Sequence, residues 1–124
     1  MPKLRKTAKF YKLDYIGQNL SFLLMLIKEG DFLYIDNAEI FYRVAEDHIK
    51  LADFLYRLHN KGVNWLMLEY DIPEIRQLYI EFQICQFTED NEGKEIDFLF
   101  IFNCNMVKAR KAYKKLHLEP LIWK

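Results

Sequence analysis

Hydroxyl side chains are scarce in this chain. Ser21 is its only serine, and Thr7 and Thr88 are its only threonines. A serine hydrolase needs an exposed hydroxyl that a neighbouring base activates on a tight turn. Ser21 lies instead in an apolar segment that reads as a helix, so the sequence argues against this class of enzyme.

Glycine is equally sparse, and the four glycines, at positions 17, 30, 62 and 93, are isolated from one another. Phosphate-binding loops need closely spaced glycines, because the backbone must approach the anion without a Cβ in the way. The chain therefore has no loop of the P-loop or Rossmann type. We expect no cofactor.

Potential metal ligands are few and far apart. Cys85 and Cys104 match no paired-ligand spacing. The three histidines are scattered along the chain at His48, His59 and His117. Since metal sites bring ligands together at helical spacing or on adjacent strands, we expect no metal site.

Long apolar runs are also missing. The longest, residues 22–27, is far shorter than the roughly 20 residues that cross a membrane. No signal peptide is visible at the start of the chain. Together with two unpaired cysteines, which suit a reducing compartment, these absences predict a cytoplasmic protein with no membrane partner.

The chain does contain charge, sorted into three blocks. Residues 1–12 carry five basic side chains and no acid, residues 13–103 carry seven basic and seventeen acidic ones, and residues 104–124 carry six basic and one acidic. The net charge of zero hides this cation–anion–cation pattern. We expect the basic ends to form a patch for nucleic acid or an acidic partner. A solvated helix face beside a frayed terminus explains the same charges without a ligand. The candidate residues are Lys108, Arg110, Lys111, Tyr113, Lys114, Lys115, His117, Lys3, Arg5, Lys6, Lys9 and Lys12.

Aromatic residues are more abundant than a small core needs, with ten Phe, eight Tyr and two Trp. Some of these rings should be partly exposed, which favours a protein–protein surface. A nucleotide bias toward AT-rich codons would give the same surplus. The rings expected to form an interaction surface are Phe32, Tyr34, Tyr42, Tyr56 and Trp123.

The periodicity of apolar residues predicts an alternating order of helices and strands. Residues 1–15 fit either type. Asn19 offers an N-cap for an apolar helix that we expect at the centre of the core. The remaining elements expected are a hairpin at 31–44 around Asp36-Asn37, a helix ending at Gly62, a strand at 63–70, strands at 77–87 and 95–103, and a helix at 106–117 with a basic outer face.

This order predicts one domain, residues 1–124, of the α+β class. We expect a single antiparallel β-sheet of about five strands packed with about three helices. The order helix, hairpin, helix, strand, hairpin, helix resembles that of roadblock-, longin- and profilin-like domains. That resemblance implies a small module, often dimeric, that serves as a platform for other proteins.

The sequence therefore favours a non-enzymatic protein–protein interaction or regulatory module, dimeric or part of a complex. The alternative is a nucleic-acid-binding protein that uses the basic C-terminal helix. A second alternative is a small toxin-type endoribonuclease, because such enzymes work with basic and aromatic residues and need no conspicuous motif. The residues suspected for that activity are Arg76, Lys111, Tyr113 and His117.

Overall fold

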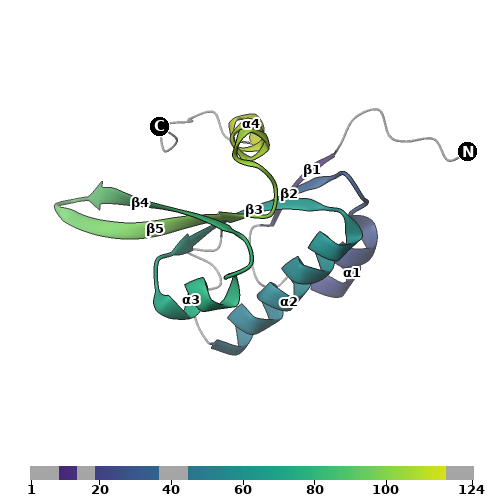
Figure 1. Ribbon diagram of the computed structural model, residues 1–124, viewed down its shortest axis with the longest axis horizontal. Helices are drawn as coiled ribbons and strands as arrows, with labels where there is room; N and C mark the ends of the chain where they lie inside the picture. Colours follow the sequence, from purple (N-terminus) through teal and green to yellow (C-terminus); the bar gives the residue numbers. More distant parts are fainter. Residues whose placement is uncertain (1–8, 14–18, 37–44, 117–124) are drawn as a thin grey trace, which may run out of the picture.

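One five-stranded sheet forms the middle of the molecule (Figure 1). The computed structural model describes residues 9–13, 19–36 and 45–116, and there it has five strands and four helices. The α+β class is confirmed. The strand order is β1-β2-β3-β5-β4, so β1 and β4 are the edges. In chain order the elements are β1 (Phe10–Leu13), α1 (Leu20–Leu26), β2 (Phe32–Asp36), α2 (Ala45–Lys61), β3 (Asn64–Tyr70), α3 (Pro73–Leu78), β4 (Gln83–Asn91), β5 (Lys94–Phe102) and α4 (Met106–Leu116).

The sheet is mixed, so the expected all-antiparallel sheet is wrong. β1 pairs with β2, and β2 with β3, in parallel register. Parallel neighbours need a crossover connection, and α1 and α2 lie in these two crossovers. Because both edges of β2 are occupied, the hairpin expected around Asp36 has no edge on which to form. Its second arm, residues 38–44, lies outside the described residues. The parallel unit also departs from the antiparallel arrangement that the roadblock-like element order implied.

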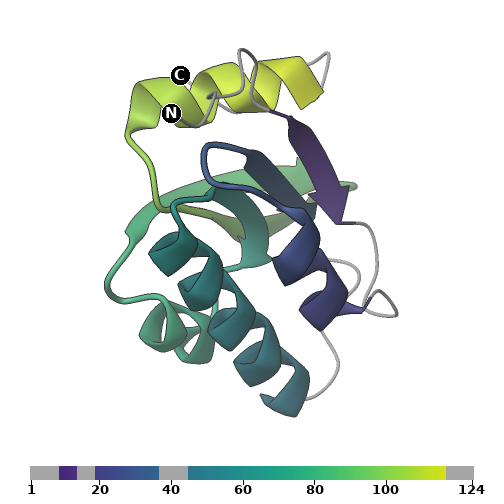
Figure 2. The same ribbon diagram turned by 90° about the vertical axis from the view of Figure 1, so that its right-hand side faces the viewer.

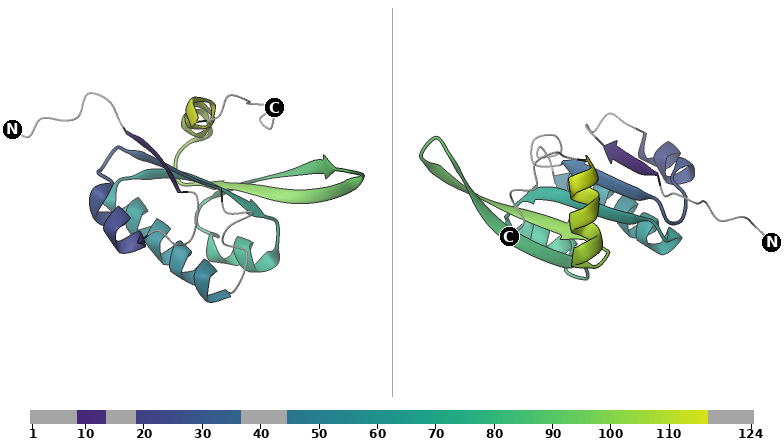
Figure 3. Two further views of the ribbon diagram at one scale, coloured as in Figure 1. Left: turned by 180° about the vertical axis from the view of Figure 1, so that it is seen from behind. Right: turned by 90° about the horizontal axis from the view of Figure 1, so that it is seen from above.

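The antiparallel part of the sheet is a long hairpin of β4 and β5. These strands pair along their whole length, and both residues of the turn, Glu92 and Gly93, have positive φ (53° and 84°). Such angles suit a tight two-residue turn. β3 pairs with β5 only as far as Phe98, so the tip of the hairpin projects beyond the rest of the sheet (Figure 3).

A short helix, α3, replaces the first part of the strand expected at 77–87. Pro73 stands in its first turn, where a fixed φ favours helix and the missing N–H costs nothing. Ile75 anchors the helix in the core, with 1% of its surface exposed. The strand begins later, at Gln83, and continues beyond Phe87 to Asn91.

The sheet separates two layers of helices. Figures 1 and 2 show α1, α2 and α3 against one face and α4 alone against the other. Alternate residues of each strand supply the two cores, as the period of a strand requires. On the first face Trp65 and Met67 of β3 pack in one cluster with Leu55 of α2. On the second, Phe100 of β5 packs with Tyr113 of α4.

The structure confirms the helix predicted to end at Gly62 and the one predicted at 106–117, which are α2 and α4. The predicted position of α1 at the centre of the core is wrong. Asn19 does cap α1, since its side-chain oxygen accepts a hydrogen bond of 3.0 Å from the amide of Phe22. However, α1 ends at Leu26, and none of its seven residues is buried. It lies at the margin of the first layer rather than in the centre of the core.

Candidate functional site

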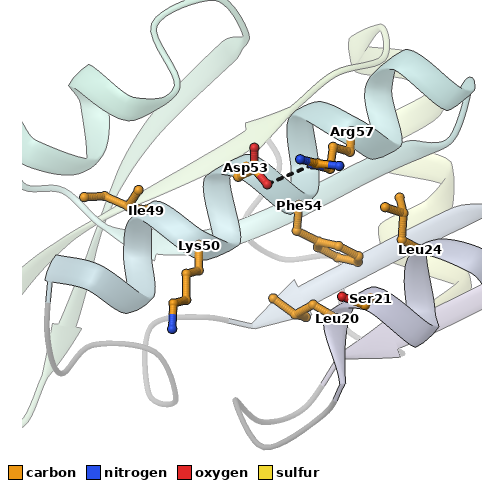
Figure 4. A pocket seen from close by; sticks show the side chains of 8 residues that line it. All are labelled: Leu20, Ser21, Leu24, Ile49, Lys50, Asp53, Phe54 and Arg57. Atoms are coloured by element: carbon orange, nitrogen blue, oxygen red, sulfur yellow. Dashed lines mark hydrogen bonds and ion pairs between the residues drawn. The ribbon is translucent and has the colours of Figure 1, made fainter.

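Among the described residues, four of the six exposed large apolar side chains lie on α1 and α2. Phe22, Met25 and Leu26 of α1 expose 59%, 73% and 42% of their surface, and Ile49 of α2 exposes 57%. Beside them, α1 and α2 enclose a hollow of about 610 Å³ (Figure 4). We call these four residues and the hollow the α1–α2 surface. The hollow is lined by Leu20, Ser21, Leu24, Ile49, Lys50, Asp53, Phe54 and Arg57.

The hollow has an apolar floor and a charged rim. Leu20 and Leu24 are half-buried against the core, and Phe54 is buried. On the rim, the guanidinium Nε of Arg57 lies 2.9 Å from Oδ2 of Asp53, one helical turn away. The described residues that line the hollow include no histidine.

The exposure of α1 follows from its composition and its length. Five of its seven residues are leucine or methionine, and the other two are Ser21 and Phe22. A helix with apolar side chains on every side can bury only the side that faces the core. Leu20, Leu23 and Leu24 occupy that side, and the remaining apolar side chains are left outside. The sequence correctly indicated that this helix is apolar on all sides, but the prediction that it lies at the centre of the core is wrong.

The aromatic residues expected on an interaction surface are mostly elsewhere. Phe32 and Tyr34 are 2% and 1% exposed beneath α4, so their expected exposure is wrong. Burial, then the nearby charge of Asp36, raises the pKa of Tyr34. Tyr56 is half-buried, and its hydroxyl donates a hydrogen bond of 3.2 Å to the carbonyl of Leu78. Tyr42 and Trp123 lie outside the described residues.

A second surface is formed by the basic side chains of α4. All five of its cations are exposed, and the helix contains no acidic residue. At its far end the ammonium of Lys115 lies 4.7 Å from the ring centroid of Phe10 in β1. β1 also carries the exposed Lys12, and exposed Lys9 precedes it. The described parts of the two basic blocks, residues 9–12 and 108–115, therefore lie side by side. We call this the basic surface, and it comprises Lys9, Lys12, Lys108, Arg110, Lys111, Lys114 and Lys115.

Tyr113 does not interleave with these cations, contrary to expectation. It is 7% exposed and packs against the sheet, with its ring centroid 6.1 Å from that of Tyr34 and 5.3 Å from that of Phe100. The other basic-patch residues, Lys3, Arg5, Lys6 and His117, lie outside the described residues. The described residues of the basic surface are therefore lysines and one arginine, without an exposed aromatic ring among them.

Acidic side chains gather on the β4–β5 hairpin, away from α4. Five carboxylates and one lysine lie in the two strands and their turn. Thr88 donates a hydrogen bond of 2.7 Å to Asp97 across the strands. A second hollow, of about 370 Å³, lies at the base of the hairpin and is lined partly by Asp71 and Asp97. The charge blocks of the sequence are therefore also separate in space.

A buried polar cluster lies at the end of β3, and sequence reasoning missed it. Glu69 is fully buried; its Oε1 accepts a hydrogen bond of 2.9 Å from the amide of Tyr70, and its Oε2 lies 3.8 Å from Nδ1 of His48. Burial, followed by the charge of Glu69, raises the pKa of Tyr79, whose hydroxyl has no hydrogen-bond partner. The one signal in the sequence was an acid inside the apolar run 65–70. Since Tyr79 is 1% exposed, no substrate reaches its hydroxyl.

The residues suspected for an endoribonuclease do not form one site. Arg76 is on α3, where Nε and a terminal nitrogen donate hydrogen bonds of 2.7 and 3.0 Å to Asp71. This pairing lowers the pKa of Asp71 and raises that of Arg76. Lys111 is on α4, on the opposite face of the sheet (Figure 1). Tyr113 is buried, and His117 lies outside the described residues.

The described residues show neither a cluster of metal ligands nor a membrane-spanning helix. Within residues 9–13, 19–36 and 45–116, no three His, Cys, Asp or Glu side chains are grouped to hold a metal ion. Over the same residues, no helix combines the length and the apolar character needed to cross a bilayer.

Comparison with known proteins adds no relative. No protein-family model matches the chain, and no curated protein matches its sequence. The arguments about function therefore rest on the two surfaces of this chain itself.

Proposed function

We propose that this protein is a non-enzymatic interaction module of the cytoplasm that forms a homodimer through the α1–α2 surface. One observation carries the proposal: α1 has an almost wholly apolar sequence, yet none of its residues is buried. Large contiguous apolar patches on a folded protein mark contact sites. A partner that covers the patch removes this exposed surface from water.

A second copy of the chain is the partner that the surface fits. The outer side of α1 offers a ridge made by Phe22 and Met25, and the hollow beside it offers a groove. In a two-fold interface the same patch meets itself, so a ridge and a groove on one patch are complementary. The rim holds both signs of charge, with Asp53 beside Lys50 and Arg57. Such a rim matches its own copy better than a partner of uniform charge.

The exposed apolar area limits the strength of the dimer. The four apolar side chains are about half exposed in the single chain. Burying them on both copies contributes on the order of 6–12 kcal/mol. Association costs roughly 4–15 kcal/mol in lost freedom and side-chain ordering. The most favourable combination of these ranges leaves about 8 kcal/mol, which corresponds to a dissociation constant of about 1 µM, so we expect the dimer to be no tighter than micromolar.

Light scattering on the whole chain tests the proposal. At about 50 µM, above a micromolar dissociation constant, we expect a mass of twice the 15.1 kDa chain mass. The double variant Phe22→Gln/Met25→Gln should have the mass of one chain, because glutamine retains helix-forming tendency but cannot bury favourably.

A matched control distinguishes this surface from general hydrophobicity. Ile80 and Val107 are exposed by 73% and 63% and lie on neither α1 nor α2. The variant Ile80→Gln/Val107→Gln should keep the mass of the unaltered chain. A monomeric unaltered chain, or a dimer that survives Phe22→Gln/Met25→Gln, would contradict the proposal.

A further inference from the structure

We infer that the basic surface on α4 and β1 binds the phosphate backbone of nucleic acid without reading its sequence. This site lies on the opposite face of the sheet from α1 and α2 and is independent of dimer formation (Figure 2). Its ligand class follows from the arrangement of charge, from the absence of described carboxylates within ion-pair distance of the α4 lysines, and from the scarcity of exposed apolar side chains on α4.

The five cations of α4 share one side of the helix. At about 100° per residue, the buried Ala109, Ala112 and Tyr113 fall together on the side that faces the sheet. The positions of the five basic residues then fall within an arc of roughly 160° on the other side. Residues 106–116 contain no acid that would divide this arc. The helix thus presents a continuous positive ridge about 11 Å long.

Four of the five cations on this ridge are lysines, and no described carboxylate lies close enough to neutralise them. No carboxylate of residues 9–13, 19–36 and 45–116 lies within ion-pair distance of Lys108, Lys111, Lys114 or Lys115. Lys115 rests over the ring of Phe10, and this contact holds the end of the ridge against β1. There, exposed Lys9 and Lys12 continue the positive surface. The unneutralised charge of the four α4 lysines attracts a polyanion at long range.

The surface favours nucleic acid over an acidic protein because it lacks apolar anchors. Protein interfaces gain most of their energy from aromatic or aliphatic side chains seated in pockets. On α4 the aromatic ring of Tyr113 is buried, and Val107 is the one large apolar side chain with high exposure among the described residues of this helix. Contact with phosphates requires only charge, which this surface supplies. Lysine and arginine bind phosphates irrespective of sequence, and residues 106–116 contain no Asn, Gln, Asp or Glu that would pair with the edges of adenine or cytosine.

The salt dependence of binding gives a sharp test. Fluorescence anisotropy of a short labelled DNA duplex, and of a labelled RNA of the same length, is measured with the whole chain. With about five phosphate contacts, affinity for the duplex should fall roughly 500-fold between about 50 and 200 mM salt. The variant Lys111→Gln/Lys114→Gln removes two contacts, so its affinity should fall only about 40-fold over the same range. DNA and RNA should both bind, since each supplies the phosphates.

The matched control is Lys28→Gln/Lys94→Gln. Lys28 follows α1 and Lys94 lies on the acidic hairpin, and both are exposed, so this variant loses the same net charge from other surfaces. It should bind like the unaltered chain. Circular dichroism checks that every variant is folded. No binding at low salt, an unchanged salt dependence in Lys111→Gln/Lys114→Gln, or equal competition by polyglutamate, which would indicate an acidic protein ligand, would each overturn the inference.

Discussion

Replacing Asp31 with alanine should loosen β1 from the rest of the sheet. Asp31 stands just before β2 and is fully buried. One carboxylate oxygen accepts a hydrogen bond of 3.1 Å from the amide of Lys9, and the other accepts one of 2.9 Å from the amide of Lys28. The carboxylate therefore ties the residue that enters β1 to the residue that follows α1.

The size of the effect follows from these two bonds. A hydrogen bond to a charged group contributes about 1.5–3 kcal/mol, and its removal leaves partly buried amides without an acceptor. We expect Asp31→Ala to lower the free energy of unfolding by about 3–5 kcal/mol. Asp31→Asn keeps one acceptor oxygen and should cost about half as much. A domain of this size has a free energy of unfolding of about 5–15 kcal/mol, so the alanine variant should stay folded unless that total lies near the lower end of the range.

Urea denaturation at neutral pH measures these differences, with Asp53→Asn as the control. Asp53 exposes 64% of its side chain, so its replacement should change stability by less than about 0.5 kcal/mol. Hydrogen exchange reports on the two bonds directly, because the amides of Lys9 and Lys28 should lose protection in Asp31→Ala. A loss of under about 1 kcal/mol with both amides still protected would refute this account of how β1 is held.

Two further predictions concern buried and paired polar groups. Tyr79→Phe should leave stability unchanged or raise it by up to about 1 kcal/mol, because the buried hydroxyl has no hydrogen-bond partner. Tyr56→Phe removes the bond to the carbonyl of Leu78 and should lower stability by about 1 kcal/mol; urea denaturation of both variants compares them, and the reverse order would contradict the assignment. Arg76→Gln should reduce stability at pH 7, since Arg76 lowers the pKa of Asp71 and so favours the folded state wherever that carboxyl is ionised. The difference should be complete above about pH 5 and should vanish as pH falls through the lowered pKa of Asp71; thermal melts across about pH 2–7 that show a constant difference would exclude this linkage.

Local patterns predicted the elements whose apolar side is unambiguous. In α2 the spacing predicted that Ile49, Ala52, Leu55 and Leu58 face the core; the last three are buried, but Ile49 exposes 57% of its surface. In α4 the spacing placed Met106, Ala109, Tyr113 and Leu116 on the inner side and the basic residues on the outer side, and Ala109 and Tyr113 are buried. Separation of the charge blocks was likewise visible in the sequence, because the lysines of α4 have no acids among them.

Strand direction and helix depth could not be predicted in the same way. Alternation in residues 32–36 indicates a strand but not whether its neighbours run parallel to it. β1 has four residues in a strongly basic stretch, so its pairing with β2 left little signal. The exposure of Met25 depends on which elements cover α1, and that is decided by tertiary packing. The same reason explains Phe32 and Tyr34, whose cover is the distant helix α4.

The charged hairpin also bears on how the protein avoids uncontrolled assembly. β4 is an open edge of the sheet, with backbone groups that a strand from another molecule can pair with. Its outer half carries Glu89 and Asp90, and the turn adds Glu92. Two molecules that approached along this edge would bring like charges together, and the repulsion opposes fibril-like growth. The acidic residues at the tip thus oppose pairing of this edge strand with other molecules and reduce the tendency to aggregate.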